Sequence, residues 1–146
     1  LRYVSGTFDV VLNRHAAFDL DAVAGHLRPG GTFITQQVGE RNMEVVRAAL
    51  GQQLLTPTIT RREVGATPGL IVERFEEYNV EYVVHDIDSL MFWLNALDLS
   101  HADLDGRSVS TSVDVLNDVL SGNVDDRGFI TNEHRYLVVA RKIGCL

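Results

Sequence analysis

Residues 8 to 39 read FDVVLNRHAAFDLDAVAGHLRPGGTFITQQVG, and this stretch predicts the fold class of the chain. It opens with an apolar run, Phe8–Leu12, and closes with a second extended run, Thr32–Val38. Between the two runs, apolar residues at helical spacing predict a short helix near Leu20–Leu27. The Pro-Gly-Gly that follows ends this helix and allows a tight turn. Two strands joined by a helix form a βαβ unit, whose strands are parallel and whose crossover is right-handed.

The first strand also points to a candidate site. A nearly continuous apolar run is typical of a strand in a parallel sheet with helices on both faces, so Phe8–Leu12 is predicted to be buried. Asn13, Arg14 and His15 then follow at its carboxyl end. Ligands of open α/β sheets bind at the carboxyl ends of strands, so these three residues are candidates for ligand contact. The alternative is that they only cap the strand and bond to local backbone.

Further elements are predicted from periodicity, from turn residues and from acidic or amide residues that can cap helices. They are a helix near Met43–Leu50 capped by Asn42, extended runs at Leu70–Tyr78 and Val80–Val84 with a bend at Asn79, a helix from Asp86 to about Leu97, a helix at Val113–Leu120, and a last strand or hairpin at Phe129–Ile130 and Tyr136–Ala140. For the first helix, Asp19 or Asp21 is the predicted N-terminal residue. We predict one domain, residues 1–146, with no repeats.

Composition limits the classes of partner. The chain of 146 residues has 20 acidic and 13 Lys or Arg residues, a net charge of -7, which argues against nucleic acid and anionic membranes as main partners. No apolar run approaches the roughly 20 residues of a membrane-spanning helix. The single cysteine, Cys145, allows no internal disulfide and no cysteine-based metal site. We therefore expect a cytoplasmic protein with a small-molecule substrate and no metal.

Two parts of the sequence resemble class I S-adenosylmethionine (SAM)-dependent methyltransferases. The family's fourth strand is similar to residues 8–15, FDVVLNRH. The turn before its fifth strand, together with that strand, is similar to residues 27–39, LRPGGTFITQQVG. HDIDSLMFWLNAL at residues 85–97 and HRYLVVARK at residues 134–142 resemble its last helix and last strand. The resemblance implies an α/β fold: an incomplete Rossmann-like methyltransferase sheet of strands 4 to 7, in the order 4-5-7-6, with flanking helices and the last strand antiparallel.

One departure from the family matters. Its first strand ends in a glycine-rich loop that approaches SAM, and its second strand ends in an acidic residue that holds the ribose, but the sequence contains no GxGxG. The resemblance then implies the C-terminal portion of a methyltransferase, which alone binds SAM weakly or not at all and is inactive. Without strands 1 to 3, Phe8–Leu12 becomes a bare sheet edge. Such an edge is a template for pairing, so we expect a homodimer through it.

The resemblance also implies roles for individual residues. Asn13, Arg14 and His15 would lie beside SAM, and His15 would orient or deprotonate the acceptor, since a histidine pKa lies near neutrality. Further candidates for substrate contact are Phe18, Gln36 and Gln37. Core packing is the alternative for Phe18, and a satisfied polar strand end is the alternative for the two glutamines, which face opposite sides of the sheet by period-2 geometry.

The leading interpretation is therefore a SAM-dependent methyltransferase that transfers a methyl group to an unidentified small-molecule acceptor. The second interpretation is a non-catalytic α/β module for interaction or oligomerisation. A third is another α/β enzyme whose nucleotide-binding loop lies outside this chain.

Overall fold

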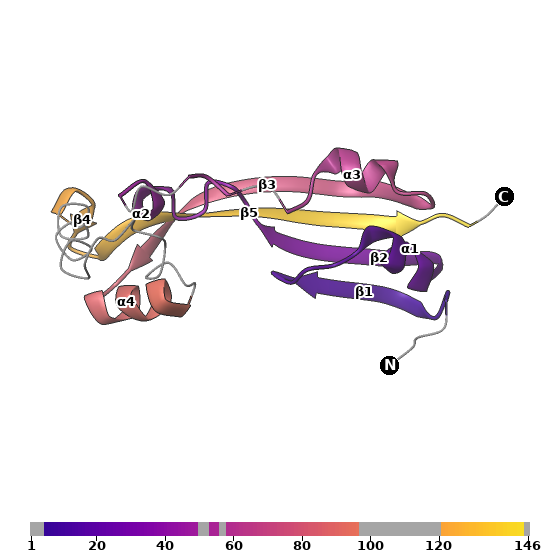
Figure 1. The fold of residues 1–146 in the computed structure, drawn as a ribbon, viewed down its shortest axis with the longest axis horizontal. Coiled ribbons are helices and arrows are strands. Elements are labelled where there is room, and N and C mark those ends of the chain that lie inside the picture. The colour runs from indigo at the N-terminus through magenta and orange to yellow at the C-terminus, as the bar shows by residue number, and fades with distance from the viewer. Residues whose placement is uncertain (1–4, 50–52, 56–57, 97–120, 145–146) are drawn as a thin grey trace, which may run out of the picture. The chain divides into compact units, whose positions relative to one another are not determined.

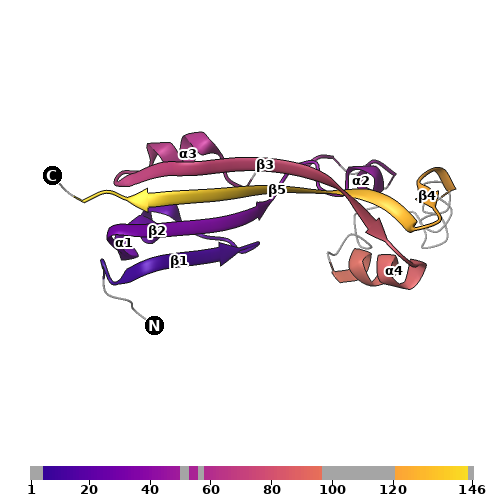
Figure 2. The ribbon, with the colours of Figure 1, turned by 180° about the vertical axis from the view of Figure 1, so that it is seen from behind.

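The computed structural model describes residues 5–49, 53–55, 58–96 and 121–144 (Figure 1; Figure 2 shows the same ribbon from behind). In chain order its elements are β1 (Phe8–Arg14), α1 (Leu20–His26), β2 (Leu27–Val38), α2 (Glu44–Ala49), α3 (Arg61–Ala66), β3 (Leu70–Val84), α4 (Ile87–Ala96), β4 (Val124–Asp125) and β5 (Gly128–Lys142). The predicted helix at Val113–Leu120 lies outside the described residues. None of the described helices is long and apolar enough to cross a membrane.

The described chain divides into two compact units. The first unit holds Leu1–Glu40, Thr56–Tyr78 and Arg135–Leu146, and the second holds Arg41–Leu55 and Asn79–His134. The candidate site lies entirely in the first unit.

The strands form a mixed sheet in the order β1-β2-β5-β3, with β4 paired to β5. β1 is parallel to β2, as the βαβ pattern predicts, and β5 is antiparallel to β2. This is the order 4-5-7-6 with an antiparallel last strand that the family resemblance implied. β3 is one continuous strand, so the predicted bend at Asn79 is wrong, and β5 likewise runs unbroken from Gly128 to Lys142.

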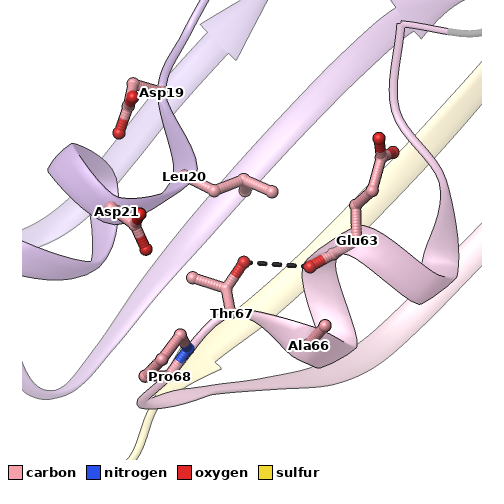
Figure 3. Close-up of a pocket in the computed structure, with 7 residues that line it drawn as sticks. All are labelled: Asp19, Leu20, Asp21, Glu63, Ala66, Thr67 and Pro68. Carbon is pink, nitrogen blue, oxygen red and sulfur yellow. Dashed lines mark hydrogen bonds between the residues drawn. The ribbon is translucent and has the colours of Figure 1, made fainter.

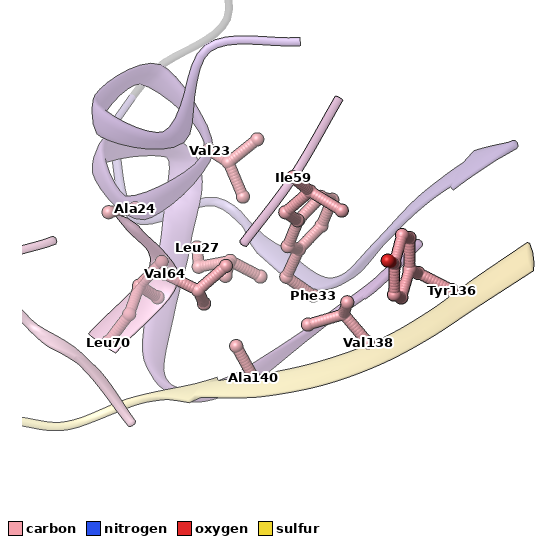
Figure 4. Packing of buried hydrophobic residues seen from close by; sticks show 10 residues of the cluster. All are labelled: Val23, Ala24, Leu27, Phe33, Ile59, Val64, Leu70, Tyr136, Val138 and Ala140. Atoms are coloured by element: carbon pink, nitrogen blue, oxygen red, sulfur yellow. The ribbon is translucent and has the colours of Figure 1, made fainter. Parts of the chain in front are cut away.

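The core of the first unit lies on one face of the sheet, under α1 and α3 (Figure 4). Its buried residues come from both helices, from the segment before α3 and from three strands: Val23, Ala24, Leu27, Phe33, Ile59, Val64, Leu70, Tyr136, Val138 and Ala140. Phe33, at its centre, is fully buried. Val11 of β1 lies opposite Phe33 and packs against this cluster.

The prediction that β1 is buried on both faces is wrong. The side chains of Val10 and Leu12 are 54% and 75% exposed. They alternate with Val11 and so point to the face opposite the core cluster, while β1 itself is an edge strand of the described sheet. In the described sheet β1 is an edge strand, which is what the family resemblance implied for a sheet without strands 1 to 3.

Local contacts explain where the first unit's helices begin and why β2 has a glycine at position 31. The Asp19 carboxylate accepts a hydrogen bond of 2.7 Å from the Ala22 N–H, so Asp19 is the N-cap of α1. Thr60 and Glu63 form a capping box at α3. Gly31 lies within β2, where the register to β1 shifts between the pairs Phe8–Leu27 and Val10–Thr32. A Cβ built on Gly31 would lie 2.9 Å from the backbone oxygens of Phe8 and Arg28, so the close approach of the backbone requires a glycine here.

In the second unit, Asp86 caps α4 as predicted, because its carboxylate accepts the Ser89 N–H at 2.7 Å. The Ser89 hydroxyl also donates to this carboxylate, at 2.9 Å, and the two hydrogen bonds hold the pKa of Asp86 below its usual value. The predicted capping role of Asn42 is wrong. Its side-chain oxygen accepts the His134 N–H, and the Glu44 N–H at the start of α2 is bound by Asn132 instead.

Candidate functional site

Asn13 lies at the carboxyl end of β1 and is held by two side chains of β2. Its Oδ1 accepts a hydrogen bond from Gln37 Nε2 at 2.6 Å and one from Thr35 Oγ1 at 3.1 Å. Gln37 Nε2 also donates to Thr35 Oγ1 at 2.7 Å. The three residues meet because Asn13 lies opposite Thr35 in the parallel register, and Gln37 is two residues further along the same face. We call these three residues the Asn13 network.

Two of the three residues of the Asn13 network are buried. Thr35 is fully buried and Gln37 is 3% exposed, whereas Asn13 lies half-buried at the surface end. A buried polar group that lost its partner would bear a desolvation cost of about 1–3 kcal/mol, so the network holds the Asn13 carboxamide in one orientation. Because the side-chain oxygen of Asn13 already accepts these hydrogen bonds, its Nδ2 amide group is the donor that a ligand could bind.

Arg14 and Gln36 lie on the opposite face of the sheet. Arg14 Nε donates to Gln36 Oε1 at 3.1 Å, and Gln36 Nε2 donates to the hydroxyl of Tyr78. Gln36 and Gln37 therefore face opposite sides of β2, as predicted. The structure groups Gln37 with Asn13 and separates both from Gln36 and Arg14, so the predicted candidates form two sets rather than one.

His15 follows directly after β1 in an unusual conformation. Its φ is +52°, in the left-handed region that non-glycine residues seldom adopt, and its N–H donates to Gln36 O at 3.0 Å. The side chain is exposed. Residues held in such conformations cluster at ligand-binding sites, where the surrounding structure stabilises them.

Phe18 is half-buried, and its ring centroid lies 5.3 Å from that of Phe33. It packs against the core cluster, which is the alternative that the sequence left open for it.

Tyr136 was not among the predicted site residues. It is buried on β5, and its hydroxyl donates to Glu40 Oε2 at 2.8 Å. Burial, reinforced by this hydrogen bond, raises the pKa of Tyr136 above its usual value. The sequence did contain a signal for this residue: a tyrosine lies within an apolar strand, and a buried tyrosine hydroxyl needs a hydrogen-bond partner.

A cavity of about 410 Å³ opens between α1 and α3 (Figure 3). Its lining residues are Asp19, Leu20, Asp21, Glu63, Ala66, Thr67 and Pro68. Two of its three carboxylates, those of Asp19 and Glu63, already cap the helices, and Thr67 Oγ1 donates to the Glu63 carbonyl at 2.9 Å. The cavity shares no residue with the Asn13 network, and helix ends account for its acidic lining.

Comparison with known proteins matches no family model and no curated protein. Solved structures do match. A putative methyltransferase from Bacillus halodurans C-125 has a TM-score of 0.54 and 13% identity, over 99% of this chain and 68% of that protein. The YcgJ protein from Bacillus subtilis has a TM-score of 0.53 and 13% identity, over 99% of this chain and 68% of that protein. A protein of unknown function from Deinococcus radiodurans R1 has a TM-score of 0.52 and 15% identity, over 94% and 51%.

The chain has a Rossmann-like methyltransferase fold. At these identities the likeness establishes the fold alone. The chain spans about two thirds of two of these structures and about half of the third.

Proposed function

We propose that this chain is part of a SAM-dependent methyltransferase that methylates a small-molecule acceptor. The observation that carries the proposal is the Asn13 network, which places a hydrogen-bond donor at the carboxyl end of a parallel strand. The fold is shared with the putative methyltransferase from Bacillus halodurans. The net charge of -7 supports a small acceptor over a nucleic acid.

The residues present fit one part of SAM. The Nδ2 amide of Asn13 is a donor suited to a carboxylate or carbonyl oxygen, such as the one that the methionine end of SAM carries. The sequence has no glycine-rich loop to cradle the rest of the cofactor. We therefore propose that the chain by itself binds SAM weakly or not at all and is inactive alone.

When bound, SAM supplies an electrophilic sulfonium methyl group. In our proposal, Asn13 binds and orients the ligand, and Gln37 supports Asn13 from the core rather than touching substrate. His15 accepts a proton from the acceptor at its imidazole, since its side chain is exposed directly beyond the strand end. Arg14 and Gln36, joined to each other on the other face, have no part in this chemistry.

The second candidate function is a non-catalytic α/β module for interaction. The exposed apolar edge of β1 favours it, because such an edge is suited to binding another strand.

Calorimetry with SAM separates the two functions. It is run on this chain and on a version extended at its N-terminus by a strand and a glycine-rich loop of a methyltransferase. The methyltransferase is supported if the extended version binds SAM and Asn13→Ala weakens this binding at least tenfold. Gln36→Ala, on the other face of the sheet, is the matched control and should leave the binding unchanged. A folded extended version that does not bind SAM contradicts the methyltransferase and favours the module.

A further inference from the structure

We propose that the second unit binds a small uncharged molecule, a carboxamide on an apolar ring, in a cavity beside α2. This inference goes beyond the proposed function and does not depend on it. The cavity has a volume of about 440 Å³, within the range of small-molecule sites, and its lining residues all belong to the second unit. They include Glu44, Val45 and Ala48 of α2, Asn79 of β3, and Ile130 and Asn132 of β5.

The side chain of Asn132 joins the walls of the cavity. Its Oδ1 accepts a hydrogen bond of 2.8 Å from the Glu44 N–H at the start of α2. Its Nδ2 donates to the Arg41 carbonyl at 2.6 Å and to Asn79 Oδ1, on β3, at 2.7 Å. Asn132 therefore fixes α2 and β3 against β5 around the cavity.

These bonds also settle which way two side-chain amides point. A backbone N–H can only donate, so the atom of Asn132 that meets the Glu44 N–H must be its oxygen. The amide nitrogen of Asn132 then meets Asn79, which must present its own oxygen. The Asn79 side chain makes no other hydrogen bond with the described residues, so its Nδ2 is left as a donor in the lining of the cavity.

Glu44 supplies an acceptor in the same lining. Arg41 donates from Nε at 3.0 Å and from Nη2 at 2.8 Å, and both bonds go to one oxygen, Glu44 Oε2. The other oxygen, Oε1, bonds to none of the residues that the structure describes. Glu44 and Asn79 are both bound to the side chain of Asn132, so the cavity has one donor and one acceptor held by the same residue.

The balance of charge in the lining selects an uncharged ligand. Arg41 and Glu44 already neutralise each other, so a charged ligand would have to compete with one of them for its partner. A carboxamide has an N–H donor for Glu44 Oε1 and a carbonyl acceptor for Asn79 Nδ2. Val45, Ala48 and Ile130 provide the apolar wall that a ring would contact.

An NMR titration with three molecules of one shape tests the class of ligand. Benzamide is neutral, benzoate is an anion, and benzamidine is a cation at neutral pH. We expect benzamide to shift the signals of Asn79, Asn132 and Ala48 in a saturable way, with the millimolar dissociation constant of a molecule this small. Benzoate and benzamidine should bind at least about fivefold more weakly, the equivalent of one hydrogen bond.

Two variants test the place of binding. Asn79→Ala removes the donor from an exposed position and should weaken benzamide binding about fivefold. Gln53→Ala is the matched control, because it removes an exposed amide of the same unit that does not line the cavity, and it should change nothing. Ala48→Trp adds an indole to the cavity from an exposed position of α2 and should abolish binding, with circular dichroism as the check that the variant folds.

Three results overturn the proposal. One is the absence of saturable benzamide shifts at the signals of the cavity residues. Another is equal binding of benzamide, benzoate and benzamidine, which would show that the site selects shape rather than the amide. The third is an equal effect of Asn79→Ala and Gln53→Ala, and this comparison decides the matter even if Ala48→Trp does not fold.

Discussion

Replacing Gln37 with leucine tests how firmly the core holds Asn13. Leucine keeps much of the glutamine's volume but removes its amide, so the main loss is of hydrogen bonds rather than of packing. Gln37 Nε2 donates to Asn13 at 2.6 Å and to Thr35 at 2.7 Å, and both Gln37 and Thr35 are buried. With roughly 1 kcal/mol for each bond and a further cost for desolvated oxygens, we expect a loss of about 2–3 kcal/mol in the free energy of unfolding.

Gln36→Leu is the matched control, because it makes the same chemical change one residue away on the other face of β2. Gln36 is half-buried. Its hydrogen bond from Arg14 is exposed and its bond to the Tyr78 hydroxyl is only part-buried, so water can replace most of what is lost. We expect this variant to lose less than about 1 kcal/mol.

Urea unfolding followed by circular dichroism measures both values, at one protein concentration because association would shift the midpoint. The order parameter of the Asn13 side chain, measured by NMR relaxation, should fall in Gln37→Leu and stay unchanged in Gln36→Leu. Equal losses of stability in the two variants would refute the argument that the Asn13 network is fixed from the core.

Two further predictions concern the glycines of α1 and β2 and the phenol on β5. Gly31→Ala should destabilise the chain by more than about 1 kcal/mol, because its Cβ would meet two backbone oxygens at 2.9 Å. Gly25→Ala, in open space on α1, should stabilise the chain by up to about 1 kcal/mol. A higher urea midpoint for Gly31→Ala than for Gly25→Ala would contradict both expectations. The raised pKa of Tyr136 means that its contribution to stability is complete below the usual tyrosine pKa and is lost as the pH rises through the higher value. In an ultraviolet titration one of the four tyrosines should therefore ionise late, and Tyr136→Phe should remove that late step.

The sequence predicted the elements whose signals are local. A capping residue and an apolar period lie within a few positions of one another, so α1 and the cap at Asp86 were placed correctly. The predicted turn of Pro and Gly instead lies inside β2, which begins at Leu27 directly after α1. The strand order followed only from the resemblance, because nothing local in β5 shows that it inserts between β2 and β3.

The predictions that were wrong, and the features that were missed, depend on residues far apart in the sequence. Asn42 looks like a helix cap in isolation, but its side chain is bound by His134, 92 positions away. Period-2 geometry placed Gln36 and Gln37 on opposite faces, yet which one meets Asn13 depends on the register between β1 and β2. The exposure of Leu12 depends on what lies beside β1, and its own apolar run reads the same for an edge as for a centre.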